Sequence, residues 1–181
     1  MTDDHVPTAL SARWAGDDRA RPPRTGDERT ILTAKLEWHR RTFELKCRGV
    51  AADRLSERGV PPSTMSLHGL VRHLAGVERW WFRIQFAGER VPMLYYSDDD
   101  PDQDFDRLDG DVGAAFEVWH AECARSREIV AAASLDDTGT TKVSREPFTL
   151  RFLLVDMIAE YARHCGHADL LRESLDGATG L

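Results

Sequence analysis

Residues 157–173 read MIAEYARHCGHADLLRE, and this stretch decides the fold. Its spacing predicts a helix that is interrupted only by Gly166 and that carries Glu160 and His164 one turn apart on one face. Apolar residues share that face, so we expect it to point inward. A carboxylate and an imidazole on an inward face need partners, because isolated buried charge is costly. A metal ion or a hydrogen bond between the two side chains would each meet this need.

The composition indicates a single domain with a sizeable core, since the chain has 181 residues and a formal net charge of −7. No Lys/Arg block marks a nucleic-acid surface, and no run of about 18 apolar residues predicts a membrane span. The N-terminus lacks the basic start and apolar run of a secretory signal. Three cysteines without C-x-x-C pairing indicate reduced thiols in a cytoplasmic protein.

Apolar periodicity predicts four long helices, and little of the sequence has a strand pattern. The expected helices cover about residues 25–50, 66–88, 111–133 and 150–175. This pattern predicts an all-α four-helix bundle. We expect the bundle domain to cover residues 25–181, after an N-terminal extension over residues 1–24 that mixes charges with prolines.

Local signals predict where these helices begin and end. Thr25 and Glu28 have the spacing of a capping box, and Ser66 and Thr149 are suited to cap the second and last helices. Gly177 is placed to end the last helix.

Two connections are less regular. Residues 92–109 are rich in aspartate but lack the glycine and final glutamate of a calcium loop, so we expect a solvated loop that closes over one end of the fold. Residues 140–143 are β-prone and predict either a small hairpin or a loop.

His73 lies on the inward stripe of the second helix and changes the interpretation of Glu160 and His164. The three side chains together offer two nitrogens and one oxygen, which leaves a fourth position for water or substrate, as in catalytic zinc sites. These donors suit zinc, nickel or iron. His167 is a competing ligand or a neighbour of the site, and we rank it below Glu160.

Three further residues have two interpretations each. Tyr161 either donates a hydrogen bond near the metal or packs in the core, and His39 either lines the pocket or is a core histidine. Asp169 either joins a charged network at the helix end or holds a ligand histidine. We expect His68 and His120 at the surface.

Other chemistry is not indicated. The sequence contains no phosphate-binding glycine loop, no G-x-S-x-G elbow and no H-E-x-x-H motif. Cys165 points about 100° round the helix from His164, so we do not expect it to be a nucleophile. No catalytic side chain is assigned.

Three segments resemble the DinB-like superfamily of metal-dependent four-helix-bundle enzymes, in a branch common in actinobacteria. They are PPSTMSLHGLVRHLAGVERWWF (61–82), YYSDDDPDQDF (95–105) and MIAEYARHCGHADLLRESLDGATG (157–180), and the similarity covers about residues 26–180. The superfamily's triad, a histidine in the second helix and an H-x-x-x-H pair in the last, falls on His73, Glu160 and His164. Glu160 departs from the all-histidine pattern but matches the related mycothiol-dependent maleylpyruvate isomerases. His167 stands where many relatives have glutamine, which ranks it below Glu160 as a ligand.

The resemblance implies a bacterial, cytoplasmic and commonly dimeric enzyme with a divalent metal, zinc first, and a thiol cosubstrate such as mycothiol or bacillithiol. We therefore expect thiol-dependent S-transfer to, or isomerisation of, a small electrophile. One alternative is a metal-dependent hydrolase. Another is a non-catalytic, stress-related protein that binds a metal or a ligand.

Overall fold

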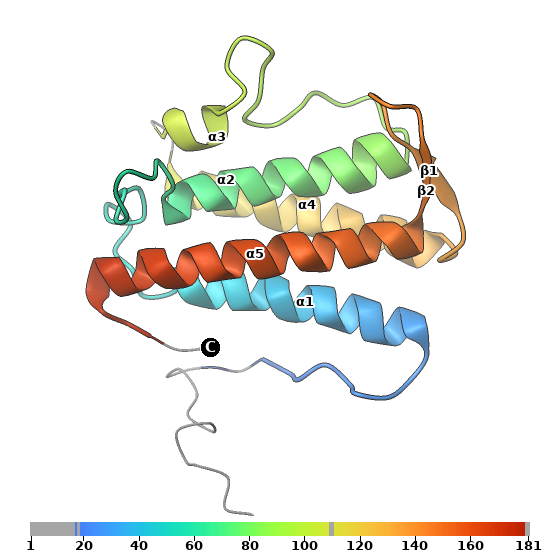
Figure 1. Cartoon of the computed structure of the whole chain (residues 1–181), viewed down its shortest axis with the longest axis horizontal. Coiled ribbons are helices and arrows are strands. Elements are labelled where there is room, and N and C mark those ends of the chain that lie inside the picture. The colour runs from blue at the N-terminus through green and yellow to red at the C-terminus, as the bar shows by residue number, and fades with distance from the viewer. Residues whose placement is uncertain (1–16, 18, 109–110, 180–181) are drawn as a thin grey trace, which may run out of the picture.

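A computed structural model describes residues 17, 19–108 and 111–179 of the chain. Four long helical segments form an all-α bundle, which confirms the predicted fold class (Figure 1). They are α1 (Glu28–Cys47), α2 (Leu67–Glu78) with its π-helical continuation η2 (Arg79–Phe86), α4 (Val112–Ala132) and α5 (Leu150–Asp176). Helix α1 packs chiefly on α5, and α2 packs chiefly on α4. Most of the N-terminal extension expected at residues 1–24 lies outside the described residues.

The predicted helix ends are mostly confirmed. The Ser66 side chain accepts a hydrogen bond from the Gly69 backbone N–H, and Thr149 caps α5 in the same way. Gly177 ends α5 with a φ of 74°, in the left-handed region that favours glycine. The capping box predicted at Thr25 is wrong, because Asp27 caps α1 instead. Its carboxylate reaches both the backbone N–H and the hydroxyl of Thr30, which Thr25 lies too early in the chain to do.

The connection between η2 and α4 crosses over α2 and contains one short helix, α3 (Gln103–Asp106) (Figure 1). The connection between α4 and α5 forms an antiparallel hairpin of β1 (Thr138–Thr140) and β2 (Pro147–Thr149), in which Gly139 pairs with Phe148. Of the two structures predicted for this segment, the hairpin is correct, although it begins two residues before the β-prone run. A Cβ added at Gly139 would lie 2.7 Å from the Phe86 Cα, so only glycine fits where β1 meets the end of η2.

The core contains large apolar side chains from all four long helices. Its most deeply buried members include Phe43, Leu70, Leu74, Trp119, Leu154 and Met157. No helix among the described residues is long and apolar enough to cross a membrane.

The expectation that His68 lies at the surface is wrong. Only 1% of His68 is exposed, and its Nδ1 lies 2.9 Å from Ser56 Oγ. The connection after α1 covers the first turn of α2, where the His68 backbone N–H donates to the Leu55 carbonyl. Burial of this histidine therefore depends on a segment that periodicity does not place.

Candidate metal centre

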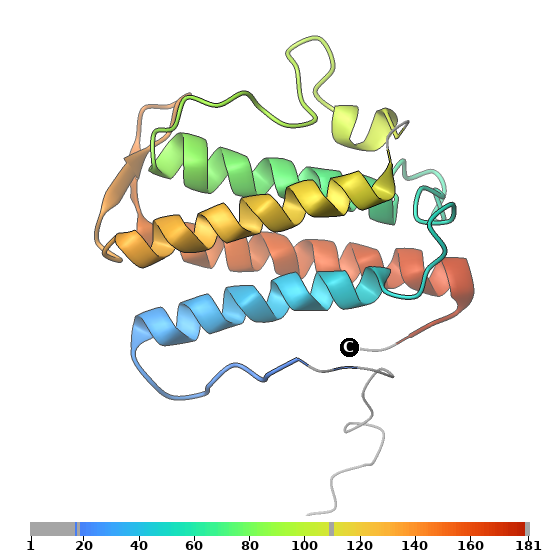
Figure 2. The same cartoon turned by 180° about the vertical axis from the view of Figure 1, so that it is seen from behind.

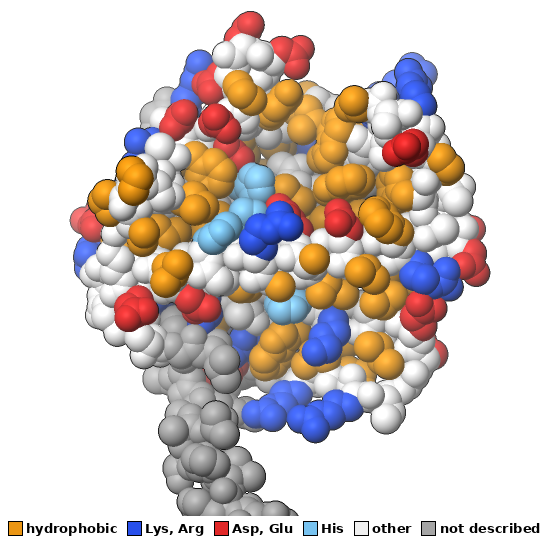
Figure 3. Space-filling view, viewed as in Figure 1, with side chains coloured by type: hydrophobic (Ala, Val, Ile, Leu, Met, Phe, Trp, Pro, Cys, Tyr) orange, Lys and Arg blue, Asp and Glu red, His pale blue; other side chains and the backbone are white. Residues whose placement is uncertain are grey.

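Helix α2 presents His73 toward α5, which presents Glu160 and His164 one turn apart. The Nε2 atoms of His73 and His164 lie 3.3 Å and 3.0 Å from the same oxygen, Glu160 Oε1. Each residue offers one ligand atom, and the three atoms lie within 4.8 Å of one another. Figure 3 shows histidine side chains reaching the surface in the region between α2 and α5. Two imidazole nitrogens and one carboxylate oxygen at this separation fit a divalent transition-metal ion.

Two charged neighbours orient the side chains of the cluster. Asp104 Oδ2, on α3, lies 2.7 Å from His73 Nδ1, so Nδ1 carries the proton and Nε2 faces Glu160. Arg163 donates to the outer oxygen of Glu160, Oε2, at 2.8 Å, which leaves Oε1 facing the histidines. A carboxylate behind a ligand histidine fixes its tautomer and raises its basicity. In this arrangement the Nε2 atoms of both histidines and Glu160 Oε1 face the same space.

The electrostatics of the centre are those of a carboxylate held between proton donors. Burial opposes the charged form of His73, but hydrogen bonds and charges from Asp104 and Glu160 outweigh it and raise the pKa of His73 to about 9. Hydrogen bonds from His164 and His73 hold the pKa of Glu160 well below its usual range. A metal ion that binds here must displace the His73 proton, so its affinity depends on pH.

Asp104 lies in the aspartate-rich segment that we expected to be only a solvated loop. Its side chain is 14% exposed, and its second oxygen, Oδ1, is buried with no hydrogen-bond partner in the described part of the chain. Sequence reasoning missed its contact with His73. The one signal available was its position within a segment that carries the family resemblance.

His167 lies beside the centre rather than in it. Its Nδ1 is 3.3 Å from His164 Nδ1. Among the described residues, it does not belong to the group of three whose possible ligand atoms all lie within 4.8 Å of one another. Burial and the neighbouring His164 lower the pKa of His167, which favours a neutral imidazole next to the ligand.

The other candidate residues lie elsewhere. The Tyr161 hydroxyl donates to Glu78 Oε1 at 2.7 Å in the bundle core, which matches the core interpretation. Asp169 forms an ion pair with Lys46 on α1, as expected of a charged network near the helix end. His39 lies half-buried on α1, a helix that contributes none of the three ligands.

None of the three cysteines forms a disulfide. Burial raises the pKa of the Cys165 thiol to about 12, so it stays protonated near neutral pH. This agrees with the expectation that Cys165, although adjacent to His164 in sequence, is not a nucleophile.

An open cavity of about 370 Å³ lies against the centre, with His73 and Asp104 in its wall. The rest of the wall is largely apolar and comes from α2, η2, the connection that crosses over α2, and Val143 in the loop between β1 and β2. It includes Val77, Trp80, Met93, Leu94, Tyr95 and Tyr96. The volume suits a small organic molecule.

A comparison with protein families is consistent with this geometry. A family model described as mycothiol-S-transferase matches residues 31–177, which is most of the chain and includes all three clustered side chains. No curated protein matches the chain.

Proposed function

The chain belongs to the mycothiol-S-transferase family, and on this premise we propose that it is a metal-dependent enzyme that joins the sulfur of mycothiol to a small electrophile. The observation that carries the proposal is the convergence of His73, Glu160 and His164 beside an apolar cavity. Zinc is the metal that we propose first, and nickel and iron suit the same donors.

The protein's own residues prepare the centre. The Nδ1–H of His73 donates a hydrogen bond to Asp104, which leaves the Nε2 lone pair to bind the metal. Arg163 binds the outer oxygen of Glu160 and steadies the carboxylate. Three protein ligands leave a position for an external ligand.

A divalent metal ion would lower the pKa of a bound thiol and so supply a thiolate near neutral pH. In the overall reaction a carbon–sulfur bond forms, the leaving group departs with its bonding electrons, and the thiol proton passes to solvent. The side chains of Trp80, Met93 and Leu94 would hold the apolar part of the electrophile and exclude water around it.

The first test measures metal content. The purified wild-type protein and the variants His73→Ala and His164→Ala are analysed beside His120→Ala, which removes an exposed histidine that pairs with Glu44 and does not belong to the cluster. We expect wild type and His120→Ala to hold about one equivalent of metal and the other two variants to lose most of it. Equal metal content in all four proteins would refute the triad.

The second test measures transfer. The metal-loaded protein is given 1-chloro-2,4-dinitrobenzene with mycothiol, glutathione or cysteine, and thioether formation is followed by absorbance. We expect acceleration with mycothiol that His73→Ala loses and His120→Ala keeps. No acceleration by any thiol would favour a non-catalytic binding protein, and hydrolysis without a thiol would favour the hydrolase.

We also propose a cytoplasmic homodimer. The exposed apolar residues Phe152, Val155 and Leu170 on α5 support the dimer, and three free cysteines support a reducing compartment. Sedimentation of wild type and of Phe152→Glu tests the dimer, which the variant should weaken. A wild-type monomer at all concentrations would refute it.

A further inference from the structure

A second cavity, of about 470 Å³, lies between α1 and α4 on the side of the bundle away from the metal centre. Figure 2 shows these two helices together on the face opposite that of Figure 1. The cavity is lined by residues of α1 and α4 together with Leu154 of α5, and it contains none of the three clustered ligands. This cavity is therefore separate from the proposed transferase site.

The wall of this cavity is rich in arginine. Arg29, Arg40 and Arg127 all line it, and Glu37 is the one carboxylate among the described residues of its lining. Arg40 is 4% exposed and binds both oxygens of the fully buried Glu78, at 2.8 Å and 2.7 Å. Arg29 donates to the backbone carbonyls of Val130 and Ala133, at 2.9 Å and 2.6 Å. The guanidinium groups that bind the two carboxylates are therefore those of Arg40 and Arg127.

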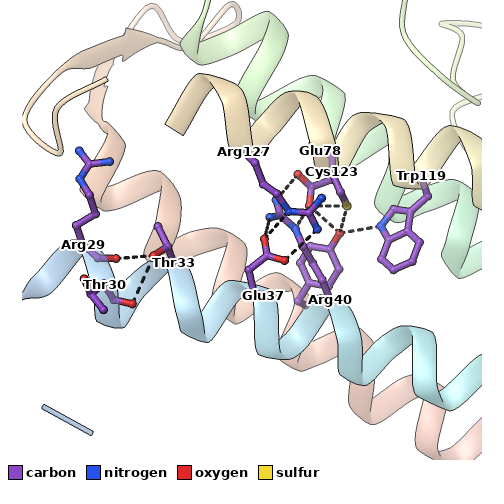
Figure 4. Close-up of polar contacts among 10 residues, drawn as sticks. Arg29, Thr30, Thr33, Glu37, Arg40, Glu78, Trp119, Cys123 and Arg127 are labelled. Carbon is purple, nitrogen blue, oxygen red and sulfur yellow. Dashed lines mark hydrogen bonds and ion pairs between the residues drawn. The ribbon is translucent and has the colours of Figure 1, made fainter. Parts of the chain in front are cut away.

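Glu37 shows how a carboxylate binds there. Arg127 donates to both of its oxygens, Nε to Oε1 at 3.0 Å and Nη2 to Oε2 at 2.9 Å, and Arg40 adds a third bond at 2.6 Å (Figure 4). The two bonds from Arg127 are the fork geometry that guanidinium groups make with carboxylates. The Glu37 side chain is 32% exposed and the Arg127 side chain is 50% exposed, so both can rearrange without opening the core.

The remaining wall is apolar. Leu36, Val130, Ala131 and Leu154 line the cavity beside the charged group. A ligand that fits this wall has one negative end and a short hydrocarbon body. The volume of the cavity lies within the range of small-molecule sites, about 300–1,000 Å³.

We propose that this cavity binds a small monocarboxylate with an apolar body, whose carboxylate takes the place of Glu37 on Arg127. In the unliganded protein Glu37 fills the anion position and keeps the arginines paired. The ligand must compete with Glu37, so the charge at position 37 sets the affinity.

The test uses octanoate as the probe and isothermal titration calorimetry on the purified full chain. We expect saturable binding of one octanoate, weakened about tenfold in Arg127→Gln and strengthened about tenfold in Glu37→Gln, because each change alters a charge-assisted pair. The matched control is Arg125→Gln on the same helix, since Arg125 pairs with Glu89 and Glu128 and does not line the cavity. It should leave the affinity unchanged.

Two further titrations distinguish this cavity from the metal centre and from nonspecific uptake of hydrocarbon. 1-Octanol, which has the same chain without the charge, should bind much more weakly than octanoate. His73→Ala should bind octanoate as wild type does, because its change lies at the other site. The proposal is overturned if neither wild type nor Glu37→Gln binds octanoate, if Arg127→Gln has no effect, or if His73→Ala abolishes binding. Circular dichroism of each variant establishes that it is folded.

Discussion

Replacing Asp104 by alanine should weaken metal binding by removing the carboxylate behind His73. Asp104 Oδ2 lies 2.7 Å from His73 Nδ1 and fixes which ring nitrogen faces the other ligands. Loss of such a partner costs about 10- to 100-fold in metal affinity, which is about 1.4–2.8 kcal/mol. Zinc affinity, measured by competition with a chromophoric chelator, gives the value directly.

The size of this loss should depend on pH. In the wild type a proton competes with the metal for His73, whose pKa is about 9, so the affinity near pH 7 is reduced by roughly 100-fold. Asp104→Ala lowers that pKa toward its ordinary value and relieves the competition. We therefore expect the full loss at about pH 9 and a much smaller one at about pH 7.

The control is Asp106→Ala, also on α3, because Asp106 pairs with the exposed Arg58 and does not touch the ligands. This variant should bind zinc as wild type does at both pH values. The reasoning is refuted if Asp104→Ala keeps wild-type affinity near pH 9, or if its loss is the same at both pH values.

Four further predictions concern stability and the placement of α3. In the metal-free protein, protonated His73 stabilises the fold fully below about pH 6.5, and this contribution is lost as the pH rises through about 9. The free energy of unfolding, measured in urea, should therefore fall by up to ~3 kcal/mol over this range. His73→Gln should flatten the dependence of this free energy on pH. Tyr161→Phe should cost about 1–3 kcal/mol in urea unfolding, because it leaves Glu78 and the Trp119 indole N–H without their shared partner; an unchanged midpoint would contradict this. Gly69→Ala should weaken zinc binding, since its Cβ would lie 2.6 Å from the Phe105 ring and displace α3. Gly166→Ala, which meets no atom within 4 Å, should bind zinc normally and raise stability by about 0.5–1 kcal/mol.

The bundle itself was predictable because its signals are local. Helical periodicity places four long amphipathic segments, and Ser66, Thr149 and Gly177 act as their end signals suggest. The capping box at Thr25 failed because a better acceptor, Asp27, stands closer to the first turn. Where two residues near a helix start could act as the N-cap, the one whose side chain reaches the backbone N–H groups of the first turn caps the helix.

The amino-acid sequence alone determined that Glu160 and His164 share a helix face, because the helical repeat fixes the positions of residues four apart. It also identified His73, whose place on an inward stripe follows from the same repeat. The contact between Asp104 and His73 was decided only by the tertiary structure, since no periodicity places the irregular segment that crosses over α2. The same holds for the pairing of Arg127 with Glu37, which are 90 residues apart and meet only because α1 and α4 lie side by side. The positions of candidate ligands within one helix follow from the sequence. The side chains that orient them, and both cavities, follow from how distant segments pack.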